Sequence, residues 1–458
     1  MDRDGLPLPQ RHWSMLAIAL GIAMAALDSA IANVALPTMS KELGATPADS
    51  VWIVNAYQLA IVVALLPLAS LGECIGYRRI YLGGLVFFTA GSFACSQSGS
   101  LAVLVTSRAV QGLGAAGIMS VNGALVRLTY PKARLGGGIG LNALVLSIAA
   151  ALGPTIASAI LAIGPWEWLF AVNVPIGIVN FVIASRALPD SDLSDEAFDW
   201  RSAFLNILMF GSFFISVDIF SQGKQLVMAG VLLATALVAG VVLFWRELKA
   251  PQPLVPIDLL RNPVFSLSVL TSVCSFAAYM LAFVALPFYF QTALHRNQVE
   301  TGFLMSPWPV AVGLAAPLAG RLSDRISSAI LGACGLGVLA IGMALLATLP
   351  GHASILRISW PMALCGLGFG FFQAPNNRTF LSSAPLERAG AASGMLAVAR
   401  LLGLTTGATL SAVIFRFVPT GAESTALLAG SVLAGTAAVI SLTRLRGQMP
   451  STASSPQP

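Results

Sequence analysis

Long apolar runs separated by short polar connections make up almost the whole chain. A bilayer core of about 30 Å is crossed by roughly 20 residues of α-helix, and runs of that length recur along the sequence. The longest polar stretch between them is the acidic segment 188–201. The pattern predicts an all-α polytopic membrane protein with fourteen spans, near residues 13–34, 51–71, 80–98, 101–126, 138–162, 168–187, 202–221, 225–245, 263–291, 302–320, 329–349, 356–377, 391–415 and 424–442.

The sequence also repeats itself. At an offset of 254 residues, segment 112–114 matches 366–368 and segment 153–160 matches 407–414, and the offset drifts to 250 nearer the N-terminus. An even number of spans separates the copies, so both start from the same side, as in transporters with parallel repeats and a site near the midplane between them. We therefore predict two six-helix bundles plus two inserted central helices. The predicted domains are an N-terminal bundle in 1–187, a linker with the inserted pair in 188–262, a C-terminal bundle in 263–445 and a short cytoplasmic tail in 446–458.

The composition is typical of a membrane protein, and the positions of the basic residues explain the net positive charge. Of 458 residues, 57% are hydrophobic and 10% are charged, whereas soluble domains carry roughly 25% charged residues. With the N-terminus in the cytoplasm, five of the 25 basic residues fall outside, two lie inside spans and the other 18 are cytoplasmic, which is the usual bias of membrane proteins. The net charge of +6 therefore indicates orientation, with both termini cytoplasmic, and no nucleic-acid partner is expected.

Two charges inside the predicted spans are candidates for proton coupling. A charge at the centre of a membrane helix costs roughly 2.5–3.5 kcal/mol on insertion scales, so each needs a reason. Asp28 and Arg108 are not repeated in the second copy, where Ala278 and Met362 take their places, and this asymmetry favours a role in function. A lone carboxylate in a low-dielectric cavity can exchange a proton or attract a cation, and a neighbouring arginine stays charged and modulates its proton affinity. The alternatives are an Asp28 hydrogen-bonded to a neighbouring helix and an Arg108 in a structural ion pair.

A wider set of residues is predicted to line a substrate cavity. Arg400 is a third charge inside a span, and Leu146 is its counterpart in the repeat. The other candidate wall residues are polar or aromatic: Asp28, Trp52, Tyr57, Gln58, Gln111 and Phe372. Trp52 is equally well suited to anchor the membrane interface.

The connection between the second and third spans, 69–79, is a candidate conformational latch. Its glycines permit a tight turn, and an acid and nearby arginine recur at the matched place in the second copy. The alternative is that its basic residues only set orientation. The candidate latch residues are Gly72, Glu73, Gly76, Arg78, Arg79, Asp324 and Arg325.

The fifth span carries a face of small residues. Gly153 and Ala157 lie one helical turn apart, and small faces let helices approach closely. Pro154 bends the backbone between them. Tight packing is the first interpretation, and sealing of a leak path is the functional one.

The sequence holds no signal for other chemistry. The five cysteines stand singly, the three histidines lie in loops or at ends, and no GxxxxGK phosphate-binding motif is found. We expect neither an enzyme nor an ATP-driven pump, with no metal site and no cofactor.

Taken together, the motifs resemble the fourteen-helix drug:proton antiporter family of the major facilitator superfamily. The resemblance rests on LDSAIANVALP (27–37), ASLGECIGYRR (69–79), RAVQGLGAAG (108–117), ALGPTIAS (151–158) and WEWLFAVNVPIG (166–177). The sequence departs from the family pattern with Ala69 and Glu73 in the loop, which puts the latch geometry in doubt, and with Ala157 and Ser158 in the fifth span.

The resemblance implies export of lipophilic, often cationic, amphipathic compounds in exchange for protons. Asp28 would take up the proton, Arg108 would help to couple the two movements, and the proton gradient would drive alternating access. It also implies a multi-pass protein of the bacterial cytoplasmic membrane, in contact with lipid and monomeric. The alternative function is export of one specific metabolite or siderophore.

Overall fold

The computed structural model is helical almost throughout. It describes residues 5–131, 135–191, 193, 198–222, 225–248, 257–323, 325–350, 353–383 and 389–448. The predicted latch residue Asp324 lies outside these residues.

The first half of the chain forms one bundle. Its helices are α1 (Gln10–Glu42), α2 (Pro47–Ser50), α3 (Trp52–Ile75), α4 (Tyr77–Ser96), α5 (Leu101–Thr129), α6 (Leu135–Ile163), α7 (Trp168–Ala171) and α8 (Asn173–Ala187). The inserted pair follows as α9 (Trp200–Gln222) and α10 (Leu226–Glu247), and the short α11 (Ile257–Leu260) leads out of it.

The second half forms the other bundle. Its helices are α12 (Pro263–Phe288), the π-helix η2 (Tyr289–Ala293), α13 (Gln298–Met305), α14 (Pro307–Leu322), α15 (Ser328–Ala347), α16 (Ile355–Ser382), α17 (Ala389–Phe417) and α18 (Ala422–Gln448). Several helices begin at a polar residue that accepts a hydrogen bond from the first turn, as Ser100 does from the Val103 N–H and Asn297 from the Glu300 N–H.

Each of the fourteen predicted spans coincides with one helix or with two consecutive helices. Among the described residues, twelve segments are long and apolar enough to cross a membrane, and α4 and α6 occupy the remaining two positions. The predicted all-α fold of two six-helix bundles plus an inserted pair is thereby confirmed. The boundaries differ in places. The helix α1 continues through Pro37 to Glu42, and the tenth span is divided at Ser306, because Pro307 cannot donate a backbone hydrogen bond.

The two bundles repeat the same close helix contacts. A Cβ at Gly84 would lie 2.8 Å from the Gly114 carbonyl oxygen, and a Cβ at Gly335 would lie 2.6 Å from that of Gly368. These are matched pairs, α4 on α5 in one bundle and α15 on α16 in the other. The internal repeat read from the sequence is therefore a repeat of packing.

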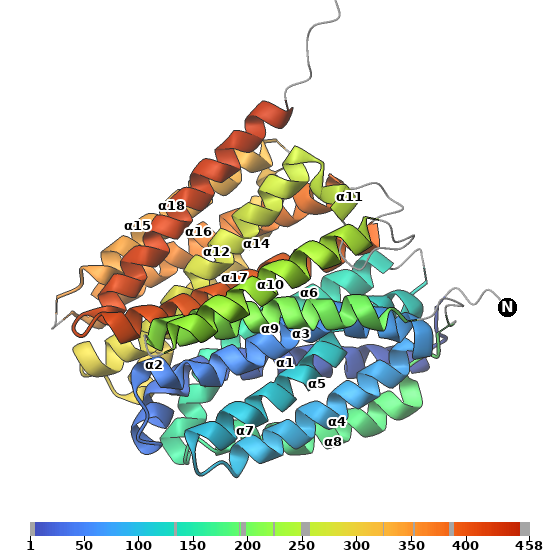
Figure 1. Ribbon diagram of the computed structural model, residues 1–458, viewed down its shortest axis with the longest axis horizontal. Helices are drawn as coiled ribbons and strands as arrows, with labels where there is room; N and C mark the ends of the chain where they lie inside the picture. The colour runs from blue at the N-terminus through green and yellow to red at the C-terminus, as the bar shows by residue number, and fades with distance from the viewer. Residues whose placement is uncertain are drawn as a thin grey trace, which may run out of the picture.

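The start of α1 and the end of α18 lie on one side of the molecule, here called the terminus side, and the opposite side is called the far side. The helices of the two bundles converge at the far side, at the left of Figure 1, and diverge towards the terminus side. At the far side the Arg416 guanidinium donates to the Asp49 carboxylate at 2.7 Å, and the Thr155 and Ser306 hydroxyls are 2.7 Å apart. Both contacts join one bundle to the other, so the far side is closed.

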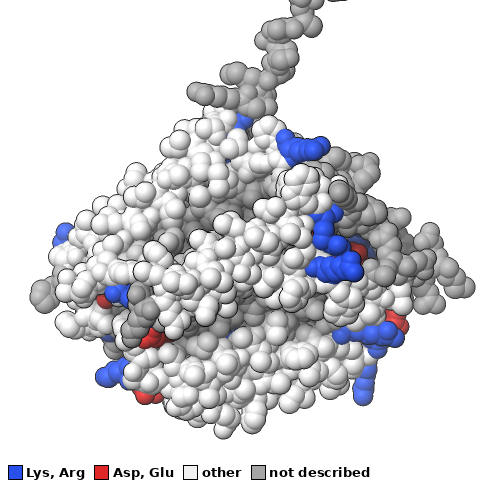
Figure 2. Space-filling model, in the orientation of Figure 1, with Lys and Arg blue, Asp and Glu red and all other residues white. Residues whose placement is uncertain are grey.

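Charged side chains are concentrated at the two sides of the visible face, and a broad uncharged band lies between them (Figure 2). The helices α9 and α10 cross this face in front of the two bundles (Figure 1). The Asn206 amide on α9 donates to the Val63 carbonyl at 2.9 Å, which attaches the inserted pair to α3. The uncharged band is the surface expected where the protein meets lipid.

Candidate functional site

The Asp28 carboxylate is the centre of a buried polar network that joins three helices of the first bundle. Its side chain on α1 is 1% exposed and pairs with Arg108 on α5, which is 0% exposed. The Asp28 Oδ1 accepts hydrogen bonds from Gln111 Nε2 at 2.8 Å and from Asn173 Nδ2 at 3.0 Å. With three donors around it, the carboxylate is bound as an ionised acceptor.

Arg108 is held by several groups of the first bundle, although its Nη2 has no hydrogen-bond partner among the described residues. Its Nε donates to the Ile53 carbonyl at 3.0 Å and its Nη1 to Gln111 Oε1 at 2.6 Å. The guanidinium carbon lies 4.1 Å from the centre of the Tyr57 ring, a cation–π distance. Removing one partner of such a buried ion pair costs about 3–5 kcal/mol.

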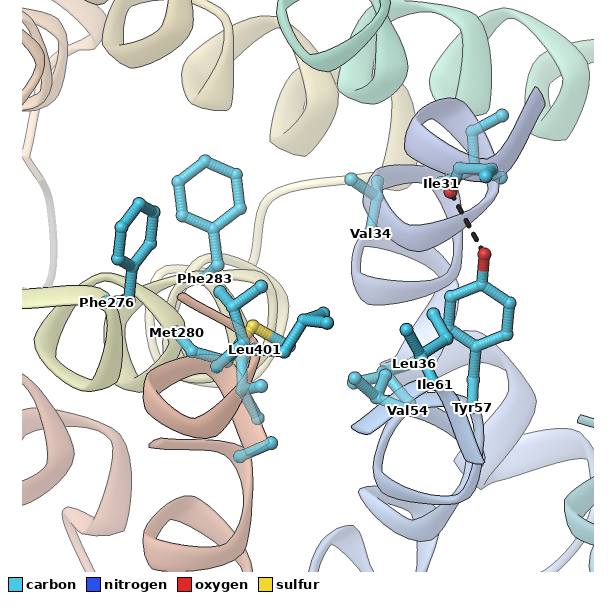
Figure 3. Packing of buried hydrophobic residues seen from close by; sticks show 14 of the residues in the cluster. Ile31, Val34, Leu36, Val54, Tyr57, Ile61, Phe276, Met280, Phe283 and Leu401 are labelled. Atoms are coloured by element: carbon cyan, nitrogen blue, oxygen red, sulfur yellow. Dashed lines mark hydrogen bonds between the residues drawn. The ribbon is translucent and has the colours of Figure 1, made fainter. Parts of the chain in front are cut away.

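A cavity of about 170 Å³ lies between the two bundles. A cavity needs about 10–15 Å³ for each water molecule, so this one has room for on the order of ten waters or for one organic molecule of a few fused rings. Tyr57 and Ile61 of the first bundle and Met280, Phe283 and Leu401 of the second line the cavity. Figure 3 shows the labelled residues of the two bundles as two separate groups, with the Tyr57 hydroxyl turned towards α1. The cavity is therefore placed where a rocking motion of the bundles would expose it to either side.

The wall from the second bundle is aromatic. Tyr279 stacks on Phe283 with ring centres 4.2 Å apart, and both rings meet Trp308 edge to face at 5.7 and 5.4 Å. Phe276 and Phe369 complete this side of the cavity. Rings in these arrangements present flat faces suited to another aromatic molecule.

Three of the residues predicted to line a cavity do so: Tyr57, Gln58 and Arg400. The Gln58 amide donates to the Ser29 hydroxyl at 3.0 Å. The Arg400 guanidinium lies 5.5 Å from the centre of the Phe276 ring. Tyr57 both lines the cavity and covers Arg108, so it connects the cavity with the buried ion pair.

The other four predicted wall residues lie elsewhere in this conformation. Asp28 and Gln111 are turned into the buried network of the first bundle and do not reach the cavity, because their polar groups bond each other and Arg108. Phe372 is fully buried beside Phe369, one helical turn away from the lining position. Trp52, at the start of α3, is also absent from the lining.

The predicted latch residues make contacts within their own half of the chain. Gly76, between α3 and α4, has φ 103°, which a side chain rarely allows. Arg78 pairs with Asp190 at 2.9 Å and donates to the Ser185 carbonyl, which connects α4 to the chain after α8. Arg79 donates to the Ile75 carbonyl at 3.2 Å.

The remaining latch positions lie at the same turn or at its counterpart in the second bundle. A Cβ at Gly72 would lie 2.9 Å from the Tyr77 ring, so this glycine allows the turn to pack closely. Glu73 lies near the end of α3, and Arg325 is exposed after α14.

The small face of α6 packs on both bundles. A Cβ at Gly153 would lie 2.4 Å from that of Ala30 on α1. Pro154 lies inside α6, and Ala157 is fully buried. The neighbouring Ser158 hydroxyl donates to the Gln298 carbonyl of the second bundle at 3.3 Å. This face therefore forms part of the far-side closure.

Several functional candidates were missed in the sequence. Asn173 lies in a quoted motif, but its role depends on how α8 packs against α1. Trp308 could have been found, because it is the repeat counterpart of Tyr57 at an offset of 251, and both line the cavity. Arg444, counted among the cytoplasmic charges, is fully buried and donates to Asn376 at 2.8 Å.

Comparison with known proteins identifies the family. The chain matches the Major Facilitator Superfamily over residues 18–408. It is 50% identical over 447 residues to the uncharacterized transporter YebQ of Escherichia coli strain K12, covering 97% of this chain and 98% of that protein. It is 28% identical over 412 residues to the riboflavin transporter RibZ of Clostridioides difficile, covering 89% of each. It is 31% identical over 410 residues to the multidrug resistance protein Stp of Mycobacterium tuberculosis, covering 88% of this chain and 75% of that protein. The chain therefore belongs to the Major Facilitator Superfamily, in the drug:proton antiporter family that its motifs resemble.

Proposed function

We propose that the protein is a proton-coupled multidrug exporter that moves lipophilic compounds across the bacterial cytoplasmic membrane by alternating access. The observation that carries the proposal is the buried Asp28 carboxylate, which holds three helices together and lies one residue, Tyr57, away from the cavity between the bundles. In this proposal both termini are cytoplasmic, the protein works as a monomer in contact with lipid, and the proton gradient drives transport without a cofactor.

The conformation suggests how the two movements would be coupled. With the far side closed, Asp28 is bound as an ionised acceptor, which is the state expected when the cavity faces the cytoplasm and has released its proton. Opening to the far side would give Asp28 access to external protons. Proton uptake would then loosen α1 from α5 and α8 as the cargo leaves. Arg108 would restore the ionised state on return, because it remains charged throughout.

The names of the relatives support transport but not one cargo. One is named a multidrug resistance protein and another a riboflavin transporter. The second name fits the alternative that this chain transports one specific metabolite. A resistance screen separates the two: a multidrug exporter raises tolerance to several unrelated lipophilic compounds when overproduced, and a single-metabolite exporter changes none.

The coupling role of Asp28 is tested in everted membrane vesicles. Uptake of a cationic and an anionic dye is followed under an imposed pH gradient, so that the result does not depend on cargo charge. Asp28→Asn keeps the size of the side chain and one acceptor oxygen but cannot exchange a proton, so gradient-driven uptake is expected to fall at least tenfold. Asp199→Asn, in the loop before α9, is the matched control and should transport normally. Undiminished uptake by Asp28→Asn refutes the proposal.

A further inference from the structure

Arg400 places an uncompensated positive charge on the wall of the central cavity. It lies on α17 among the residues that line the space between the bundles. Its guanidinium rests near the Phe276 ring. No hydrogen bond or ion pair of Arg400 is found within the part of the chain that the structure describes.

The sequence offers no nearby acid that could neutralise this charge. The helices α12, α14, α15, α16 and α17 contain no aspartate or glutamate. In the first bundle, Asp28 is the acid at this depth, and it is already bound by Arg108, Gln111 and Asn173. The described lining of the cavity therefore contains a cation and no carboxylate.

A charge at this depth is expensive. An arginine at the centre of a membrane span is costly to insert, and such residues mark substrate paths. Arg108 offsets much of this cost through its ion pair with Asp28 and its hydrogen bonds to Gln111 and the Ile53 carbonyl, although its Nη2 has no partner among the described residues. Arg400 has no ion pair or hydrogen bond of this kind among the described residues. The contrast indicates that the partner of Arg400 comes from outside the chain.

The other residues that line the cavity indicate what else a bound molecule should contain. Flat rings of Tyr279, Phe283 and Trp308 form one wall, and the amide groups of Gln58 and Gln373 add a few polar contacts. Such a surface stacks on a planar aromatic molecule, and a guanidinium binds carboxylate, sulfonate or phenolate oxygens in a fork.

We propose that the cavity selects flat aromatic anions, with the acidic group of the cargo bound to Arg400 and its rings against the aromatic wall. This inference rests on the proposed function, because it names the cargo that the same cavity would carry. It replaces the cationic cargo implied by the family resemblance, because a cation in this cavity meets a like charge without a carboxylate to offset it.

The test is equilibrium binding to the purified full-length protein in lipid nanodiscs, with no pH gradient. The two probes are fluorescein, an anion, and rhodamine 6G, a cation on a similar xanthene ring system, each followed by fluorescence anisotropy. Wild type is expected to bind fluorescein more tightly than rhodamine 6G. A hydrogen bond to a charged group is worth about 1.5–3 kcal/mol, so Arg400→Gln should weaken fluorescein binding by about 10- to 100-fold and leave rhodamine 6G unchanged or stronger.

Two further variants keep the result interpretable. Arg400→Lys retains the charge and should keep the preference for fluorescein, and Arg357→Gln makes the same change at an exposed position and should bind as wild type. A misfolded Arg400→Gln would lose both dyes, so retained rhodamine 6G binding or an unchanged melting temperature shows that the fold is intact.

The proposal is overturned if wild type prefers rhodamine 6G, if it binds no fluorescein, or if a folded Arg400→Gln binds fluorescein as wild type does. Because the binding assay uses no gradient, a failure of proton coupling at Asp28 does not alter it. Equally, loss of the anion preference leaves the result of the vesicle experiment unchanged.

Discussion

Replacing Gly302 by alanine tests whether direct packing of α6 on α13 closes the far side. A Cβ at this position would lie 1.4 Å from the Ser158 Oγ, 2.6 Å from the Ser158 Cβ and 2.7 Å from the Pro154 carbonyl oxygen. The hydroxyl can rotate away, but the Ser158 Cβ and the Pro154 backbone cannot. The two helices must therefore move apart in this conformation.

The expected cost follows from overpacking. Adding a methyl group to a tightly packed contact typically costs about 1–3 kcal/mol. Gly302 and Ser158 belong to different bundles, so this cost falls on the conformation that is closed at the far side and is relieved when the bundles separate there. A coupling of about 1–3 kcal/mol changes a two-state population by about 5- to 150-fold. Gly302→Ala should therefore shift the protein towards a state open at the far side.

The population is measured by the distance between two spin labels on the far side, one at Glu42 at the end of α1 and one at Phe417 at the end of α17. Both positions are exposed. The more accessible native cysteines, Cys74, Cys274 and Cys334, are first replaced by serine. Gly302→Ala should move the distance distribution to longer values.

The matched control is Gly320→Ala on α14, where an added Cβ meets no atom within 4 Å. It changes helix propensity equally and should leave the distances unchanged. If Gly302→Ala gives the same distance distribution as wild type, with the same melting temperature, the far side is not closed by this contact and the reasoning fails.

Three other changes probe separate parts of the molecule. Burial alone would raise the pKa of Asp199, but hydrogen bonds from Ser202 and Arg246 lower it to about 2. The backbone amides at the start of α9 should therefore be protected from hydrogen exchange above about pH 4 and lose that protection as the pH falls through about 2. Asp199→Asn should lower the free energy of unfolding by less than about 1 kcal/mol at pH 7, because the Asp199–Arg246 ion pair is partly exposed. Arg444→Met leaves buried hydrogen-bonding groups without a partner, so thermal unfolding should show a loss of about 1–3 kcal/mol with unchanged dye preference. Asp49→Asn removes a half-exposed ion pair at the far side and should broaden the spin-label distances less than Gly302→Ala, since such pairs are worth about 1 kcal/mol or less.

Each of these expectations has a clear contrary result. Protection of α9 that persists at pH 1.5 means that the carboxylate does not support the helix start. An unchanged melting temperature in Arg444→Met means that its buried hydrogen bonds contribute nothing net. An Asp49→Asn effect larger than that of Gly302→Ala would place the closure at the ion pair instead of the packed face.

The span pattern and the two unrepeated charges could be predicted from the sequence, for physical reasons. Apolar runs of membrane length have few alternatives to a spanning helix. The cost of burying Asp28 and Arg108 singled them out, and the structure brings them into contact. Each of these charges needs a partner inside the membrane, and the opposite charge on a neighbouring span supplies one.

The cavity wall could be predicted only in part, because the helices that form it are apolar on all sides. Phe369 and Phe372 lie one turn apart on α16 and are equally hydrophobic, yet Phe369 lines the cavity and Phe372 is buried away from it. The choice of face depends on how α16 packs against α14 and α15, which the sequence pattern does not contain. Asn173 was missed for the same reason, since it reaches Asp28 from the start of another helix.

The structure explains how the chain accommodates a residue larger than glycine at Ser158, one of the two departures from the family motif. The family's usual glycine is replaced by Ser158 at the point where α6 meets Gly302 of the other bundle. The small residue needed for close approach is therefore supplied by α13 in this chain. The helices α6 and α13 therefore still pack closely, although the glycine lies on α13 and not on α6.

The proposed anionic cargo of the Arg400 cavity would also change how membrane voltage acts on transport. Moving one charge across the membrane is worth about 2.3 kcal/mol per 100 mV. An anion leaving as one proton enters moves two charges in the direction favoured by a negative interior, about 4.6 kcal/mol at 100 mV, or roughly three orders of magnitude in concentration ratio. A monovalent cation exchanged for one proton moves no net charge. If Arg400 selects anions in exchange for protons, as proposed, the membrane voltage itself would drive export even where the pH is equal on the two sides.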